Sequence, residues 1–154
     1  MDLRGRLQAA TKEAMKARAS ERLSTLRLIG AAVKDREIAA RGTDGDGGEL
    51  ADTDLIAILS KMVKQRQESA KAYEEGGRLE LAQQEEGEIS VIQEFLPRQL
   101  SDDEAAAAVD EVIAQLEAGS IRDMGRVMAE LRNRYAGQMD FGSVGAMVKA
   151  RLLG

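Results

Sequence analysis

The sequence contains no cysteine, no histidine and no tryptophan, and it has only one proline. The missing cysteine excludes disulfide frameworks, thiolate nucleophiles and zinc fingers. The missing histidine also excludes a serine–histidine or cysteine–histidine catalytic pair. A chain of 154 residues typically buries about 70% of the surface that its unfolded form exposes, so it needs neither a metal nor a disulfide to fold.

Aromatic residues and long apolar runs are also scarce. Aromatic side chains make up 3% of the chain, which argues against nucleic-acid binding through a stacking platform. No apolar run is long enough to span a membrane, and residues 1–20 lack the apolar centre of a signal peptide. We therefore expect a soluble, cytoplasmic protein of bacterial type.

The charge is negative overall but unevenly distributed. The net charge of −5 argues against a molecule that is basic over its whole surface. Residues 1–41, however, hold ten Lys and Arg against five Asp and Glu, whereas residues 42–60 hold five acids and no base. Any anion-binding surface is therefore expected to be local.

The pattern of apolar residues predicts an all-α fold. Helix-forming residues dominate, and no segment shows the period-two alternation of a strand. The expected helices cover roughly residues 2–18, 21–41, 53 to the glycine pair at 76–77, 79–96, 102 onward, 123–136 and 141–153.

Several helix ends have recognisable signals. Ser20 is expected to cap the second helix and Gly42 to end it. Pro97 is expected to end the fourth helix. Ser101 and Glu104 have the spacing of a capping box, in which each side chain binds a free amide at the start of the next helix.

The stretch FLPRQLS, residues 95–101, marks the expected domain boundary. It divides the chain into an antiparallel N-terminal helical domain, 1–97, and a small three-helix C-terminal domain, 98–154.

One arginine falls on the apolar side of its helix. At 100° per residue, Arg66 lies among the inward residues of the third helix, while Glu85 and Glu88 lie on the inward side of the fourth. If the two helices fold back at residues 76–77, Arg66 faces Glu88, with Glu85 one turn away. We interpret the group as a structural ion pair that fixes the register of the helices, with a catalytic role as the alternative.

Two rows of cations recur every seven residues on the outward sides of the second and third helices. They are Arg27, Lys34 and Arg41, and Lys64, Lys71 and Arg78. Each row would extend about 21 Å, long enough to follow several phosphates. The alternative is a solvated face, because Glu68 and Glu75 follow Lys64 and Lys71 by one helical turn.

The acidic segment at 42–54 resembles a calcium loop only superficially. If Asp44 were the first ligand, Asp46 would fit the third position, but the sixth would be Glu49 instead of glycine. The twelfth would be Leu55, where a bidentate glutamate is needed. We therefore expect a mobile acidic loop and no metal site.

The C-terminal segment carries methionines on its inward side. Met124, Val127, Met128 and Leu131 share one face of the helix expected at 123–136, and Gly125 would allow another helix to approach closely. A methionine-rich face is either an adaptable partner-binding surface or simply core.

Three segments together resemble the YqeY family. KQRQESAKAYEEGGRLELAQQEEGEISVIQEFLPRQLSDDE, residues 64–104, is similar to the family signature of Lys-Gln-Arg, an aromatic, Gly-Arg, spaced glutamates and Leu-Pro-x-Gln-Leu-Ser. ERLSTLRLIGAAVKDREI and DMGRVMAELRNRYAGQMD resemble its second helix and its C-terminal motif. The acidic loop and Gly87, which should soften the fourth helix, depart from the pattern.

The family is related to the tail of GatB, the B subunit of the glutamine-dependent Asp/Glu-tRNA amidotransferase. That relation implies an all-α domain joined to a three-helix tail, of which Gly125, Met128, Gly137 and Asp140 carry the clearest motif. The tail of the amidotransferase helps to hold tRNA, while amide activation and ammonia delivery lie elsewhere in that enzyme. The resemblance thus implies a link to a carbon–nitrogen ligase reaction with glutamine as nitrogen donor, without supplying a catalytic site.

We therefore expect an accessory module that binds tRNA or a tRNA-processing protein, with no cofactor and no catalytic residue of its own. The phosphate-binding candidates are Arg27, Lys34, Lys64, Lys71, Arg78, Arg122 and Arg126. The alternative is a protein–protein interaction module that uses the second helix or the face of Met124 and Met128. A free-standing amide-transfer enzyme is a third hypothesis, against which the missing nucleophile argues.

Overall fold

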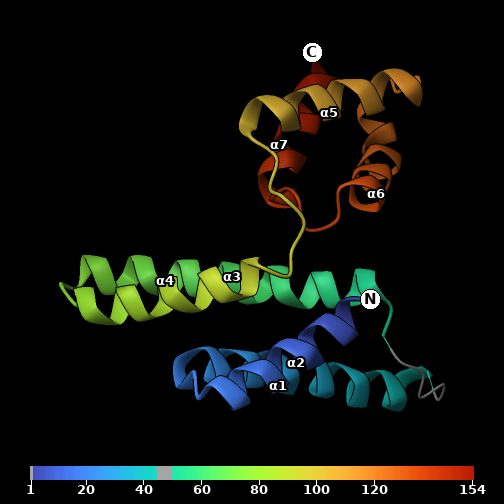
Figure 1. Cartoon of the computed structure of the whole chain (residues 1–154). Helices are drawn as coiled ribbons and strands as arrows, with labels where there is room; N and C mark the ends of the chain where they lie inside the picture. The colour runs from blue at the N-terminus through green and yellow to red at the C-terminus, as the bar shows by residue number, and fades with distance from the viewer. Residues whose placement is uncertain (1, 45–49) are drawn as a thin grey trace. The chain divides into compact units, whose positions relative to one another are not determined.

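The computed structural model describes residues 2–44 and 50–154, and within these ranges all the regular structure is helical (Figure 1). The all-α prediction is confirmed. The helices are α1 (Leu3–Ala17), α2 (Ser20–Asp44), α3 (Asp52–Glu75), α4 (Leu79–Gln93), α5 (Asp102–Gln115), a short 3₁₀ helix η1 (Ile121–Asp123), α6 (Met124–Arg134) and α7 (Phe141–Leu153). In the described ranges, no helix combines the length and the apolar character that crossing a bilayer requires.

The chain divides into two compact units, residues 1–96 and residues 97–154, and each is described by itself. The first unit holds α1–α4, with α3 and α4 packed side by side as a long hairpin (Figure 1). Its core draws on all four helices. The buried residues of this core are Leu3, Ala10, Ala14, Leu26, Ile29, Val33, Leu55, Leu59, Met62, Val63, Ile92 and Phe95.

The turn between α3 and α4 depends on a glycine. Gly77 has φ of +74°, a left-handed conformation that glycine adopts without the steric cost of a side chain. The Arg78 amide donates to the Tyr73 carbonyl at 2.7 Å across this turn. Leu59 and Phe95, whose numbers place them opposite each other in the hairpin, are both buried.

Three helix ends differ from the sequence prediction. Gly42 does not end α2, which continues to Asp44, because a glycine inside a helix costs only about 1 kcal/mol and ends it only with further signals. Ser20 is the first residue of α2 and not its cap. At the other end of the unit, α4 stops at Gln93, and residues 94–96 form a tight turn before Pro97.

That tight turn is tied to the first two helices. Arg6 of α1 donates to the Glu94 carbonyl at 3.0 Å and lies over the Phe95 ring, 5.5 Å from its centroid. Arg22 of α2 donates to the Glu94 carboxylate at 2.6 Å. These contacts hold the end of α4 against α1 and α2.

The second unit is a three-helix cluster of α5, α6 and α7. The capping box at its start is present: the Glu104 amide donates to the Ser101 hydroxyl at 3.1 Å, and the Ser101 amide donates to the Glu104 carboxylate at 2.9 Å. Gly137 turns the chain before α7 with φ of +75°, and Asp140 caps α7 by accepting from the Gly142 amide at 3.0 Å.

The expectation that Gly125 permits close helix packing is wrong. An added Cβ at Gly125 would meet nothing within 4 Å, whereas one at Gly145 of α7 would lie 3.7 Å from the Met128 methyl and 3.9 Å from that of Met124. The close approach is therefore made on α7. Met128 is buried and Met124 is half-buried, so this face belongs to the core of the unit.

Candidate functional site

Arg66 and Glu88 are brought together across the α3–α4 hairpin. The Arg66 Nε donates to Glu88 Oε2 at 3.0 Å, and the Arg66 Nη1 donates to the Met62 carbonyl at 3.3 Å. The two charged side chains are 15% and 20% exposed, so the pair is largely shielded from water. An ion pair in such a place fixes which turns of the two helices face each other.

Glu85 completes this group one turn before Glu88. Burial, followed by the repulsion of the Glu88 carboxylate, raises the pKa of Glu85, while the charge of Arg66 partly opposes the shift. One guanidinium therefore serves two carboxylates. The three side chains lie between packed helices, and none of them lines the groove that lies between α1 and α2, so the geometry favours architecture over catalysis.

The cation rows on α2 and α3 point to different sides of the first unit. Arg27 and Lys34 lie roughly 140–160° around α2 from Ile29, and Lys64 and Lys71 lie a similar angle, roughly 120–140°, around α3 from the buried Leu59. Ile29 and Leu59 belong to one shared core. The two rows therefore face away from each other and cannot follow the same stretch of nucleic-acid backbone.

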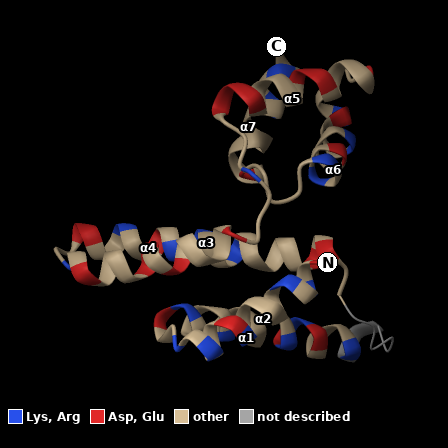
Figure 2. Cartoon of the chain, in the orientation of Figure 1, with Lys and Arg blue, Asp and Glu red and all other residues tan. Residues whose placement is uncertain are grey.

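The row on α3 is embedded in acidic surroundings. The hairpin at 52–93 carries five cations and nine carboxylates, and Figure 2 shows both colours along α3 and α4. Lys64, Lys71 and Arg78 are exposed, but a polyanion approaching this side would meet a net negative field at distances within the Debye length of about 10 Å.

The α1–α2 side has the opposite balance. Besides Arg27 and Lys34, its exposed cations include four that the row pattern did not single out: Lys12, Lys16, Arg18 and Arg36. Within the ranges that the structure describes, none of these six forms an ion pair. The excess of ten cations over five acids in residues 1–41 was the signal that could have found them. We call these six residues the α1–α2 cation group; Arg36 lies roughly 160° around α2 from Lys34, so the group spans more than one side of the helices.

The two candidate arginines of the C-terminal unit differ in availability. Arg126 donates to Asp123 Oδ1 at 3.0 Å and to the Leu116 carbonyl at 3.1 Å, so its guanidinium is engaged within the fold. The hydrogen bond from the Gly119 amide lowers the pKa of Asp123, and the hydrogen bond from Arg126 lowers it further. Arg122 is exposed on η1 and remains a candidate phosphate ligand.

The structure offers no support for a metal centre. In residues 2–44 and 50–154, no three carboxylates gather closely enough to hold an ion. Part of the acidic loop predicted at 42–54 lies outside the described residues, at 45–49; residues 52–54 begin α3.

Comparisons with known proteins give one family and a set of relatives in fungi. The model of the family described as Yqey-like protein matches residues 4–152. A fungal protein of Lachancea thermotolerans, named "Altered inheritance of mitochondria protein 41, mitochondrial", is 30% identical over 119 residues, which cover 76% of this chain and 61% of that protein. Its namesake from Clavispora lusitaniae is 33% identical over 90 residues, covering 58% of this chain and 49% of that protein.

These names state no biochemical activity. The chain spans between about half and three fifths of the length of these two relatives. Their names include the word mitochondrial, whereas the sequence predicts a cytoplasmic location for this chain, which stays a prediction.

Proposed function

Because this chain belongs to the YqeY-like protein family, we propose that it is a non-catalytic accessory module that binds tRNA through its phosphates. The observation that carries the proposal is the α1–α2 cation group, whose six exposed cations form no ion pair with the described part of the chain; Arg27 and Lys34 share one side of α2. Phosphate contacts of this kind position an RNA and carry little base specificity.

The link to glutamine-dependent tRNA amidotransferase chemistry rests on the similarity to the GatB tail. The module would hold or present tRNA, while a carbon–nitrogen ligase supplies the amide transfer. No histidine or cysteine is present in the chain to provide a conventional nucleophile–base pair, and the charged group at Arg66 is built into the helix packing.

The direct test is a tRNA titration by filter binding at 50 mM and 200 mM salt, with two matched double variants. Arg27→Glu/Lys34→Glu reverses two charges seven residues apart on α2. Lys64→Glu/Lys71→Glu makes the same charge change with the same spacing on α3. Each lost phosphate contact should lower the slope of log affinity against log salt by roughly 0.7–0.9.

The proposal predicts that the α2 variant loses tRNA affinity by at least about tenfold and has a shallower salt slope by roughly 1–2 units. The α3 variant should stay close to wild type. Equal losses in both variants would indicate a response to net charge alone, and absence of binding by folded wild-type protein would reject the RNA proposal.

A protein–protein interaction module is the second candidate. The packing of Met128 into the core removes one of the two surfaces considered for it, and the exposed Leu28 and Ile38 on α2 favour the other. Recovery of the same protein partner before and after nuclease treatment would support this candidate over tRNA binding.

A further inference from the structure

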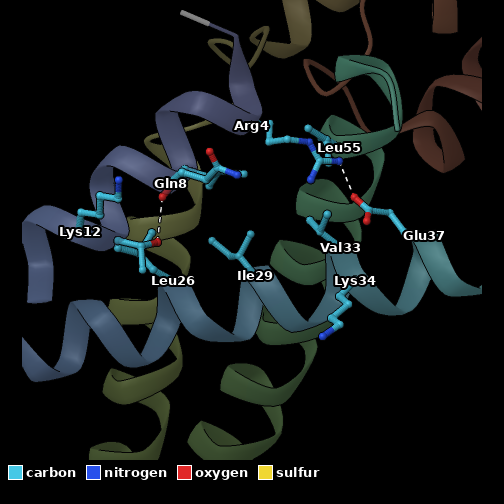
Figure 3. A pocket seen from close by; sticks show the side chains of 12 residues that line it. Arg4, Gln8, Lys12, Leu26, Ile29, Val33, Lys34, Glu37 and Leu55 are labelled. Carbon is cyan, nitrogen blue, oxygen red and sulfur yellow. Dashed lines mark hydrogen bonds and ion pairs between the residues drawn. The ribbon is translucent and has the colours of Figure 1, made fainter. Parts of the chain in front are cut away.

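A narrow groove of about 520 Å³ lies between α1 and α2 (Figure 3). Its volume falls within the range of about 300–1,000 Å³ that is usual for small-molecule sites. The proposed tRNA contacts do not require it. The residues around it come from α1, α2 and α3.

The floor of the groove is apolar. Leu26, Ile29 and Val33 recur along one side of α2 over roughly 10 Å, with Leu55 of α3 beside them (Figure 3). Each of these four side chains is less than a tenth exposed. A groove wide enough for a partner helix would leave its floor more exposed, so the dimensions suit a single thin apolar chain.

The two ends of the groove differ in charge. At one end, the Arg4 guanidinium donates to the Glu37 carboxylate, which joins α1 to α2 and neutralises both groups (Figure 3). Lys12 lies at the other end, beside Leu26 (Figure 3). Lys34 also borders the groove, but it lies next to Val33, toward the Arg4–Glu37 end, and its side chain extends away from α1 (Figure 3). Lys12 forms no ion pair with any residue in the described ranges, so the mouth of the groove at this end carries a positive charge.

One lining position also has unused space. Gly30 lines the groove from the middle of α2, and an added Cβ there would meet nothing within 4 Å. Glycine inside a helix costs about 0.5–1 kcal/mol relative to alanine. A larger side chain at this position would enter free space and narrow the groove without a clash at its Cβ.

We infer that the α1–α2 groove binds an amphiphile with a single alkyl chain and a terminal anion, such as a fatty carboxylate. The alkyl chain lies over Leu26, Ile29 and Val33, and the carboxylate sits at the mouth near Lys12. The Arg4–Glu37 pair closes the opposite end and limits the length of chain that fits. Apolar burial supplies the affinity, and Lys12 selects the charge of the head group.

Isothermal titration calorimetry of the full chain with octanoate, decanoate and dodecanoate, each below its micelle concentration, tests this site. Affinity should rise by about fourfold per added methylene, as burial of each CH₂ group requires, until the chain reaches the closed end. Dodecyltrimethylammonium, which has the same chain length and the opposite charge, should bind at least about tenfold more weakly than dodecanoate.

Two glycine variants locate the binding. Gly30→Phe should weaken dodecanoate binding by about 16-fold, the equivalent of two excluded methylenes. The matched control is Gly87→Phe on α4, where an added Cβ also meets nothing within 4 Å, and it should bind like wild type. Lys12→Gln should weaken dodecanoate without weakening the ammonium compound.

Other outcomes overturn the inference. Absence of binding by wild type rejects the site, and equal losses in Gly30→Phe and Gly87→Phe place the amphiphile elsewhere. Equal affinity for the carboxylate and the ammonium compound rejects the role of Lys12. Circular dichroism of each variant verifies that the helices are retained, and the chain-length series tests the site without any substitution.

Discussion

Replacing Arg66 with methionine should lower the free energy of unfolding of the N-terminal unit by about 2 kcal/mol at neutral pH. Exposed ion pairs contribute about 0–1 kcal/mol, and removing one partner of a fully buried pair costs about 3–5 kcal/mol. Arg66 and Glu88 are 15% and 20% exposed, between these limits. The variant also leaves Glu85 and Glu88 next to each other without a cation.

A double-mutant cycle separates the cost of the stranded carboxylate from the worth of the pair. Adding Glu88→Leu to Arg66→Met should recover most of the lost stability, because the buried position then carries no uncompensated charge. The matched control is Arg134→Met. Arg134 pairs with Glu130 one turn away, with both side chains about a third exposed, and its loss should cost only about 0.3–0.5 kcal/mol.

Urea unfolding gives the overall change, and hydrogen exchange of peptides from α3 and α4 assigns it to the hairpin. The pH dependence provides a further check. The pKa of Glu85 is already raised by burial and by Glu88, and loss of Arg66 removes the attraction that opposes this shift. The folded state then keeps a proton that the unfolded state releases, so stability rises as the pH falls.

The decrease in the free energy of unfolding caused by Arg66→Met should therefore be largest at neutral pH. It should become smaller as the pH falls toward 4.5, the ordinary pKa of a glutamate. A penalty no greater than that of Arg134→Met would refute the reasoning. So would a double variant that is as unstable as Arg66→Met alone, because the stranded carboxylate would then not be the cause.

Two further predictions concern local features. The Arg98 guanidinium and the Ser101 amide lower the pKa of Glu104 to about 2 from 4.5. The stability that this carboxylate gives the start of α5 is therefore fully present above pH 4.5 and is lost as the pH falls toward 2. Amide exchange of α5 should show this loss in wild type and not in Glu104→Gln. Gly30→Ala should raise the free energy of unfolding by about 0.5–1 kcal/mol. Gly77→Ala should lower it by about 1 kcal/mol, because residue 77 has φ of +74°. Urea unfolding measures both changes, and changes of the same sign would contradict the role of backbone conformation.

Features that depend on near neighbours in the chain could be predicted from the sequence. The capping box of Ser101 and Glu104 involves residues three apart, so its hydrogen bonds require only that a helix begins there. The facing of Arg66 and Glu88 followed from the tight turn at 76–77, because a short connection sets the register of two antiparallel helices. In each case few conformations are compatible with the pattern.

Glycine patterns were less informative because a glycine permits a conformation without requiring it. Gly42 lies inside a helix and Gly125 faces open space, although the sequence suggested a helix end and a close contact. Gly77 and Gly137 do adopt left-handed backbone. The difference lies in the tertiary structure around each glycine, which the pattern of one sequence does not contain.

The direction in which a surface faces is the property that sequence reasoning could not supply. Arg27 and Lys64 begin rows of the same spacing, and only the shared core of α2 and α3 reveals that the rows point apart. The groove is hidden for a related reason: Leu26 and Ile29 have the same helical period whether another element covers them or a cavity adjoins them. The Arg4–Glu37 pair bridges α1 and α2 at one end of the space between them, and that space places an apolar floor beside Lys12, which the sequence shows only as charge on a helix.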